Sequence, residues 1–270
     1  MLLKTLFDIK ASRSRHWISL MKKEENIILP FIKQLRNYFN KMKQEVLNNI
    51  QVAYKLIAFE KVLEPEFLFN MAKYDELLKN ISRKYLTSAY QLGIDSFYND
   101  ETKSLQEADD SYNINSPRAV QSLEEQAEEI TIINETMQKQ LLGEFEFVLA
   151  TGLILTLPYE QIAHELAMAS RNKFGFALMR TETISRTEIN GTVNMAKHDT
   201  MKEVNVKYEQ WLTARVGVRE SHVMMEGQIT AIDQPFITGD GYELKYPCDP
   251  AGPASEVCNC RCQIYPYTEA

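Results

Sequence analysis

The four cysteines of this 270-residue chain all lie within a fifteen-residue stretch near its C-terminal end. Side chains of an extended segment alternate between two faces, so Cys258, Cys260 and Cys262 would place three thiols on the same face. Zinc prefers four nitrogen or sulfur ligands in a tetrahedron, and structural zinc sites take all four from the protein. His222 and Cys248 could join two of the three thiols. The sequence therefore predicts a Cys3His metal site, with zinc as the expected ion.

Two other interpretations of the cysteine cluster are compatible with the sequence. Cysteine is among the most frequently buried residue types, so the thiols could simply pack in a small core. A disulfide, for example between Cys248 and Cys258, could form outside the cell. A nucleophilic pair of Cys260 and His222 is disfavoured, because three neighbouring thiols suit a metal better than a single activated nucleophile. We rank metal binding first, inert packing second and the disulfide third.

A second group of side chains able to do chemistry is Arg180-Thr181-Glu182, which is repeated as Arg186-Thr187-Glu188. Such residues serve in nucleases and transferases, so catalysis is one interpretation. Six residues are about 1.7 helical turns, so the two copies would face largely different sides of a helix. We favour a structural network in which Arg180 and Glu182 bond the C-terminal residues. The chain also lacks the motifs of α/β-hydrolases, P-loop NTPases, dinucleotide-binding folds and HExxH zinc proteases.

The residues that precede these groups are predicted to form long helices. From residue 27 to 63 apolar side chains recur every three or four residues, which is typical of a helix with one buried stripe. Pro30 is tolerated in the first turn of this helix, and Pro65 ends it. A second helix is expected at 66–97. Two long helices joined by a short break usually pack as an antiparallel hairpin.

A polar interval at 99–115 without periodicity is predicted to be a loop or linker. Ser116 and Pro117 then provide the N-cap and the first position of another helix. This helix is expected to reach about residue 142, to be interrupted at Gly143 and to resume as far as residue 153. Two further helices are expected to begin near residues 156 and 174, on either side of the polar residues 171–173.

The pattern changes after residue 205. The segments 207–213 and 228–232 have strand composition, and Gly239-Asp240-Gly241 predicts a turn. The expected fold class is mainly α, with long N-terminal helices packed as a hairpin or bundle and a small C-terminal α+β module. The predicted parts are an N-terminal helical region (1–98), a linker or loop (99–115), a helical part (116–205) and a small Cys/His module (206–270).

Composition narrows the class of protein further. Apolar residues make up 44% and charged residues 25%, which are ordinary values for a globular protein. No run approaches the ~18 apolar residues of a transmembrane helix. The net charge of −7 argues against binding nucleic acid by bulk electrostatics. Residues 1–50 carry ten Lys or Arg against four Asp or Glu, and residues 99–145 carry three against eleven. We interpret these as solvated helix faces rather than as a surface for DNA or an acidic partner.

Several of the residues named above form an ordered series in the second half of the chain. In chain order it consists of Arg180-Thr181-Glu182, Asn190, Asn194, Trp211, Arg219-Glu220-Ser221-His222, Gly227, Pro235-Phe236, Pro247-Cys248-Asp249-Pro250 and Asn259-Cys260-Arg261-Cys262. The series resembles the phage head morphogenesis family, the Mu F-like minor head proteins of tailed bacteriophages, over about residues 115–265. The chain departs from the family pattern at 214–219, where a common aspartate is missing. Cys248 and Cys258 are additions to the family's Asn-Cys-Arg-Cys motif.

The resemblance implies a structural role rather than an enzymatic one. It implies a minor head protein that acts in procapsid assembly at or near the portal. The implied partners are the portal protein, a scaffold or major capsid protein, and packaged DNA, with no membrane. The implied location is the virion head, after assembly in the host cytoplasm. The alternative is an enzyme or toxin-like effector, a nuclease or transferase, carried by the phage head.

Overall fold

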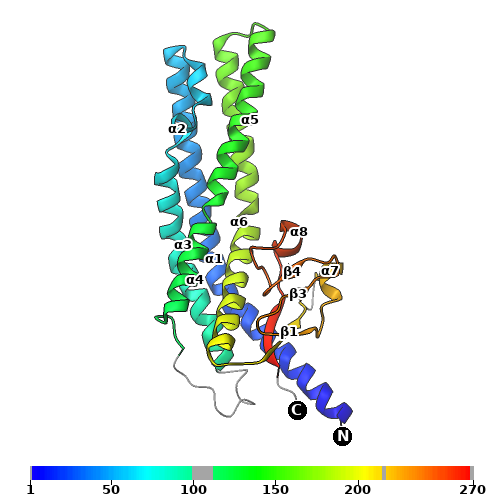
Figure 1. Ribbon diagram of the computed structural model, residues 1–270. Helices are drawn as coiled ribbons and strands as arrows, with labels where there is room; N and C mark the ends of the chain where they lie inside the picture. The colour runs from blue at the N-terminus through cyan, green and yellow to red at the C-terminus, as the bar shows by residue number, and fades with distance from the viewer. Residues whose placement is uncertain (1, 99–111, 215–216, 268–270) are drawn as a thin grey trace. The chain divides into compact units, whose positions relative to one another are not determined.

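The computed structural model describes residues 2–98, 112–214 and 217–267, with side chains described from residue 15 onward (Figure 1). Most of the predicted linker lies outside these residues, as do Arg215 and Val216 of the segment that departs from the family pattern. The described chain is mainly helical, with a few short antiparallel strands near its C-terminal end, so the predicted fold class is confirmed. None of the described helices is both long and apolar enough to cross a bilayer.

The elements follow one another along the described chain with short connections after residue 112. In chain order they are α1 (Leu2–Leu56), the 3-10 helix η1 (Phe59–Leu63), α2 (Pro65–Leu68), α3 (Met71–Ser96), α4 (Pro117–Glu129), α5 (Ile132–Ile154), α6 (Tyr159–Glu203), β1 (Tyr208–Leu212), α7 (Glu220–Val223), β2 (Ile229–Ala231), β3 (Phe236–Ile237), β4 (Glu243–Leu244), α8 (Ala254–Val257) and β5 (Gln263–Tyr267).

Helix α1 differs from the helix predicted at 27–63, because it begins far earlier, contains Pro30 in its interior and ends at Leu56. Pro65 begins the short helix α2 rather than ending the first helix. A proline inside a helix removes the bond to the carbonyl four residues earlier, which costs about 3 kcal/mol. Pro30 and Asn26 are both exposed, so water can hydrate the freed carbonyl. Buried apolar side chains continue on both sides of the proline, from Leu20 to Ala53, and their burial outweighs the local cost.

Two predicted helix breaks are also wrong. Helix α5 passes through Gly143, where an added side chain would meet open space and the helix merely forgoes about 1 kcal/mol relative to alanine. The break falls at residues 130–131, where the Thr131 hydroxyl donates to the Glu128 carbonyl (2.7 Å) and competes with the helical backbone bonds. Helix α6 continues through residues 171–173, because buried side chains on either side maintain its periodicity.

One compact unit comprises residues 32–83 and 127–182, and its helical segments lie side by side as a bundle (Figure 1). Segments of α1 and α3 form the expected hairpin, in which Lys73 pairs with Glu45. Asn134 of α5 joins this hairpin, because it accepts a hydrogen bond from Tyr38 and donates one to Asp75 (2.8 Å). Asn134 is fully buried, so these bonds fix the register of three helices at one level of the bundle.

The other unit comprises residues 1–31, 84–126 and 183–270. It contains a three-stranded antiparallel sheet of order β2-β1-β5 and a two-stranded sheet of β3 and β4. Strands β1 and β2 confirm the strands predicted at 207–213 and 228–232, and the predicted turn joins β3 to β4. Buried side chains of α3, α6 and the C-terminal segment form one core around Trp211. Both units combine separate stretches of chain, whereas the four parts predicted from the sequence are contiguous and stay a prediction.

Candidate metal centre

Three of the side chains singled out by their sequence spacing converge in the C-terminal core. Nδ1 of His222 lies 3.5 Å from the Cys260 sulfur and 3.6 Å from the Cys262 sulfur. The three ligand atoms all lie within 4.8 Å of one another. Each of these residues is at most 3% exposed. Within the described part of the chain, they form the group of His, Cys, Asp and Glu side chains that could hold a metal ion.

The separations in this group suit a tetrahedral zinc ion. Bond lengths of about 2.0–2.1 Å to nitrogen and about 2.3 Å to sulfur place a nitrogen and a sulfur ligand about 3.6 Å apart at the tetrahedral angle. The two nitrogen–sulfur distances observed are 3.5 and 3.6 Å. One imidazole and two thiols are also the donor types that zinc prefers over the oxygen ligands of calcium or magnesium. The residues present therefore fit zinc.

Two asparagines of α6 hold the segment that carries Cys260 and Cys262. Asn190 Nδ2 donates to the carbonyls of Cys260 (3.0 Å) and Cys262 (3.3 Å). Asn194 Nδ2 donates to the Cys262 carbonyl (3.2 Å), and its Oδ1 accepts from the backbone amide of Ile264 (3.0 Å). These bonds satisfy backbone groups just before β5 where the sheet ladder does not reach. Asn190 and Asn194 thus set the position of both thiols relative to α6.

Three further residues of the family series, Arg219, Trp211 and Gly227, position other parts of the centre. The Arg219 guanidinium donates to the carbonyls of Ser255 and Cys258, the latter at 2.6 Å, and so ties the end of α8 to the start of α7. Trp211 packs edge-on against the His222 ring, with centroids 5.4 Å apart. The Gly227 amide donates to the Trp211 carbonyl (2.9 Å), at a backbone φ of +78° that favours glycine.

Cys258 does not join the three gathered side chains, so the expectation of one extended segment with three thiols on one face is wrong. Cys258 ends α8, and Asn259 has a left-handed backbone with φ of +57°. This turn breaks the alternation that a strand would impose, and strand β5 begins only at Gln263. Cys258 is half-buried, whereas Cys260 and Cys262 are fully buried.

Cys248 lies beside the gathered group rather than within it. Its sulfur is 3.6 Å from the Cys260 carbonyl oxygen and 3.5 Å from Asn190 Nδ2. Its backbone is left-handed, with φ of +63°, which is uncommon for a residue with a side chain. A Cβ on Gly191 of α6 would lie 3.1 Å from the Cys248 Cβ, so glycine permits the close approach of this loop to the helix.

Glu256 is a member of the centre that sequence reasoning missed. Its Oε2 lies 2.9 Å from His222 Nε2 and accepts a hydrogen bond from the Ser221 hydroxyl (2.9 Å). A carboxylate on the far nitrogen fixes the tautomer in which Nδ1 is free to bind a metal, and such carboxylate–histidine pairs accompany many zinc sites. No spacing rule marks Glu256, because it meets His222 only through the packing of α8 against α7.

The protonation of the thiols is set by their mutual contacts. Hydrogen bonds from the Cys248 and Cys262 thiols hold the pKa of the Cys260 thiol well below its usual range. Burial raises the pKa of Cys248, and the hydrogen bond to Cys260, followed by burial, raises that of Cys262. Cys260 is therefore the thiol best suited to enter a metal site already deprotonated, since only the thiolate is a ligand.

Comparison with known proteins finds a family match over less than half of the chain. Residues 145–265 match the sequence model of the family described as Phage Mu protein F like protein. This segment belongs to the phage Mu F-like family. No curated protein and no solved structure matches the chain. The match supports a general role in phage head morphogenesis and an association with the virion. The Mu F-like segment begins within α5 and contains every residue of the metal centre.

The Arg180 and Glu182 side chains of the Mu F-like segment are exposed on α6. Their predicted bonding to the C-terminal residues stays a prediction. The second copy of the motif makes such a contact, because Thr187 Oγ1 accepts a hydrogen bond from the backbone amide of Asn259 (2.8 Å). This bond supports the left-handed turn at Asn259 and hence the position of the following cysteine. A structural use of this helix is therefore visible about two turns beyond Arg180.

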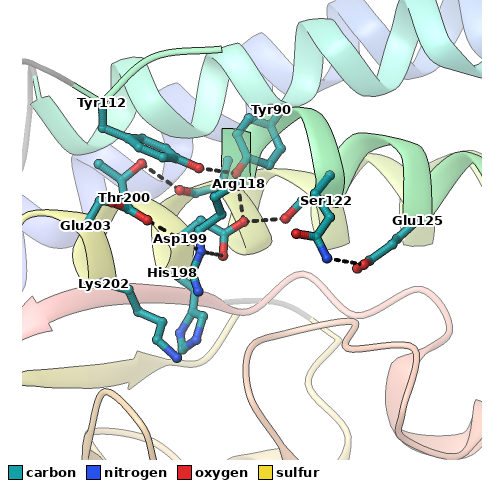
Figure 2. A network of polar contacts seen from close by, with 12 residues as sticks. Tyr90, Tyr112, Arg118, Ser122, Glu125, His198, Asp199, Thr200, Lys202 and Glu203 are labelled. Atoms are coloured by element: carbon teal, nitrogen blue, oxygen red, sulfur yellow. Dashed lines mark hydrogen bonds and ion pairs between the residues drawn. The ribbon is translucent and has the colours of Figure 1, made fainter. Parts of the chain in front are cut away.

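A second buried polar group joins Asp199 of the Mu F-like segment to residues that precede that segment (Figure 2). Its Oδ2 accepts hydrogen bonds from the hydroxyls of Tyr90 and Ser122, both at 2.7 Å, and the Tyr112 hydroxyl lies 2.6 Å from that of Tyr90. Burial and the Asp199 charge raise the pKa of Tyr90, so its hydroxyl stays protonated and donates. Arg118 faces the other carboxylate oxygen at 3.8 Å. With both oxygens engaged, this network serves to join α3, α4 and α6.

Proposed function

We propose that this protein is a minor head protein of a tailed bacteriophage, which acts in procapsid assembly at or near the portal. The observation that carries the proposal is the Mu F-like segment at 145–265. Its mechanism is binding rather than turnover. The long helices supply the docking surface, and the C-terminal module is a rigid body anchored on α6.

We further propose that the module is held together by a zinc ion on His222, Cys260 and Cys262. When bound, zinc supplies a cross-link between chain segments that are distant in sequence, and its binding free energy is folding free energy. Glu256 orients the imidazole, while Asn190 and Asn194 hold the backbone of the two thiols.

The burial of this centre favours a structural rather than a catalytic zinc ion. Catalytic zinc keeps one position open to water and substrate, whereas structural zinc is enclosed by protein ligands. His222, Cys260 and Cys262 are 1%, 3% and 2% exposed. A substrate would have to displace core side chains such as Trp211 to reach them. This enclosure supports a structural rather than a catalytic role for the centre.

Quantitative mass spectrometry of purified virions and empty procapsids tests the proposed role. The amount of this chain is measured against the portal and major capsid proteins. We expect a few copies per particle in both, and crosslinks to the portal. Loss of the chain from particles that have released their DNA would indicate ejection, while absence from every particle would refute the assignment.

A matched pair of variants links the centre to this role. His222→Ala removes a gathered ligand, and Cys258→Ser changes a thiol outside the group. We expect particles assembled with the first variant to lack the chain, and particles assembled with the second to contain it at the normal ratio. Equal incorporation of both variants would separate the metal centre from assembly.

A further inference from the structure

We propose that Cys248 is the fourth ligand of the zinc ion, so that the centre is a closed Cys3His site made by His222, Cys248, Cys260 and Cys262, with Cys258 excluded. The inference rests on the proposed zinc site and names its remaining ligand. A structural site takes four ligands from the protein, and the gathered group supplies three. The question is therefore which side chain occupies the fourth vertex.

Cys248 is already held against the same backbone as the other thiols. Its sulfur is 3.6 Å from the carbonyl oxygen of Cys260, and the Asn190 amide that contacts it also donates to the carbonyls of Cys260 and Cys262. One asparagine thus gathers all three cysteine segments on one face of α6. To bind the metal ion, the Cys248 side chain would only need to rotate about its Cα–Cβ bond to another staggered position.

The backbone at Cys248 is built for this position. Its left-handed φ of +63° is strained for any residue other than glycine. Glycine at the neighbouring helix position, Gly191, lets the loop approach to a distance that a side chain there would obstruct. Strain of this kind is retained in proteins when the surrounding structure determines the conformation. A thiol that binds a metal ion is one such constraint.

The other nearby donors are engaged elsewhere. Cys258 precedes the left-handed turn at Asn259 and is half-buried, and its carbonyl is held by Arg219. The Glu256 carboxylate faces the opposite nitrogen of His222, where it orients the ring and cannot also reach the metal side. Cys248 is the remaining buried thiol of the cluster.

Cobalt substitution of the full chain tests the assignment. Each thiolate bound to Co2+ adds to the near-ultraviolet charge-transfer band, so the band counts the cysteine ligands. The unmodified chain and Cys258→Ser should give the same band, equal to three thiolates. Cys248→Ser should lose about one third of the band, and zinc affinity measured by competition with a chelator should fall at least tenfold. Cys248→Gly, which suits the left-handed backbone, should show the same loss of the band.

Each other outcome overturns the assignment in a recognisable way. An unchanged band and affinity in both Cys248 variants would make water the fourth ligand. A smaller band in Cys258→Ser would make Cys258 the ligand. Failure of the unmodified chain to bind Zn2+ or Co2+ would overturn the zinc site as a whole. None of these results bears on whether the chain is found in phage heads, which the particle measurements determine separately.

Discussion

Replacing Asn190 by alanine should destabilise the unit that contains the metal centre by about 2–4 kcal/mol. Asn190 is 2% exposed and donates to the Cys260 and Cys262 carbonyls. After the change the Cys262 carbonyl still accepts from Asn194, whereas the Cys260 carbonyl loses its amide donor and keeps only the weak thiol donor of Cys248 at 3.6 Å. An unsatisfied buried acceptor costs about 1–3 kcal/mol, and each further hydrogen bond lost costs about 1 kcal/mol. Asn190 also accepts from Gln263 (2.6 Å), which retains Glu24 as a second acceptor.

The two tryptophans make this change measurable. Both Trp17 and Trp211 belong to the unit that includes the metal centre, and the other unit has none. Urea unfolding followed by tryptophan fluorescence, at constant metal content, therefore reports on this unit alone. Glu124→Ala, an exposed position of α4 in the same unit, is the matched control and should shift the free energy of unfolding by less than about 0.5 kcal/mol. If Asn190→Ala falls in the same range as this control, the argument that the asparagine positions the cysteine segment is refuted.

Three further changes have expected results. Burial raises the pKa of Glu24 from 4.5 to about 8. Between these two pH values the folded state keeps a proton on Glu24 that the unfolded state has lost. Raising the pH from 4.5 to 8 therefore lowers the free energy of unfolding, by at most about 1.4 kcal/mol per pH unit from this group. Urea titrations at pH 5.5 and 7.5 should show a smaller loss of stability for Glu24→Gln than for the unmodified chain, and equal losses would contradict the assignment. Removal of zinc by a chelator should shift tryptophan emission to the red. It should leave most of the far-ultraviolet helical signal, because none of the proposed zinc ligands belongs to the helices of the other unit. Unchanged emission after all zinc has been removed would argue against a structural ion. Pro30→Ala should raise the thermal midpoint, with a gain of up to about 3 kcal/mol, since it restores an amide donor inside α1; a lower midpoint on calorimetry would show that the proline is required.

The helices could be predicted from the sequence because their evidence is local. Apolar residues at threes and fours identified the buried stripe of α1 from Ile28 to Ala53, and those positions are buried. The errors arose where a local rule met a longer-range contact. The sequence predicts a helix that begins at residue 27 with Pro30 in its first turn, whereas burial on both sides of Pro30 continues α1 through it. It also predicts a break at Gly143, although nothing competes with the helix there.

The composition of the metal centre was predicted only in part, for a related reason. Residue types and proximity in sequence identified the cysteines and His222, but alternation on an assumed strand wrongly grouped Cys258 with Cys260 and Cys262. The left-handed turn at Asn259 depends on a bond to Thr187, more than seventy residues away in the chain. Glu256 carries no sequence signal, since its role exists only once α8 packs beside α7.

The C-terminal module depends on contacts between residues that are distant in sequence, and a metal ion would stabilise such contacts. The C-terminal module after residue 205 is short, and its strands contain five residues or fewer. Such small sheets bury too little apolar surface to be stable alone, so they depend on docking against α6 and on cross-links. His222 and Cys260 are separated by 38 residues in sequence. An ion that joins them closes this loop, and the asparagines of α6 then hold the closed loop against the helix. Zinc binding and docking on α6 therefore stabilise the same arrangement, and loss of either should weaken the other.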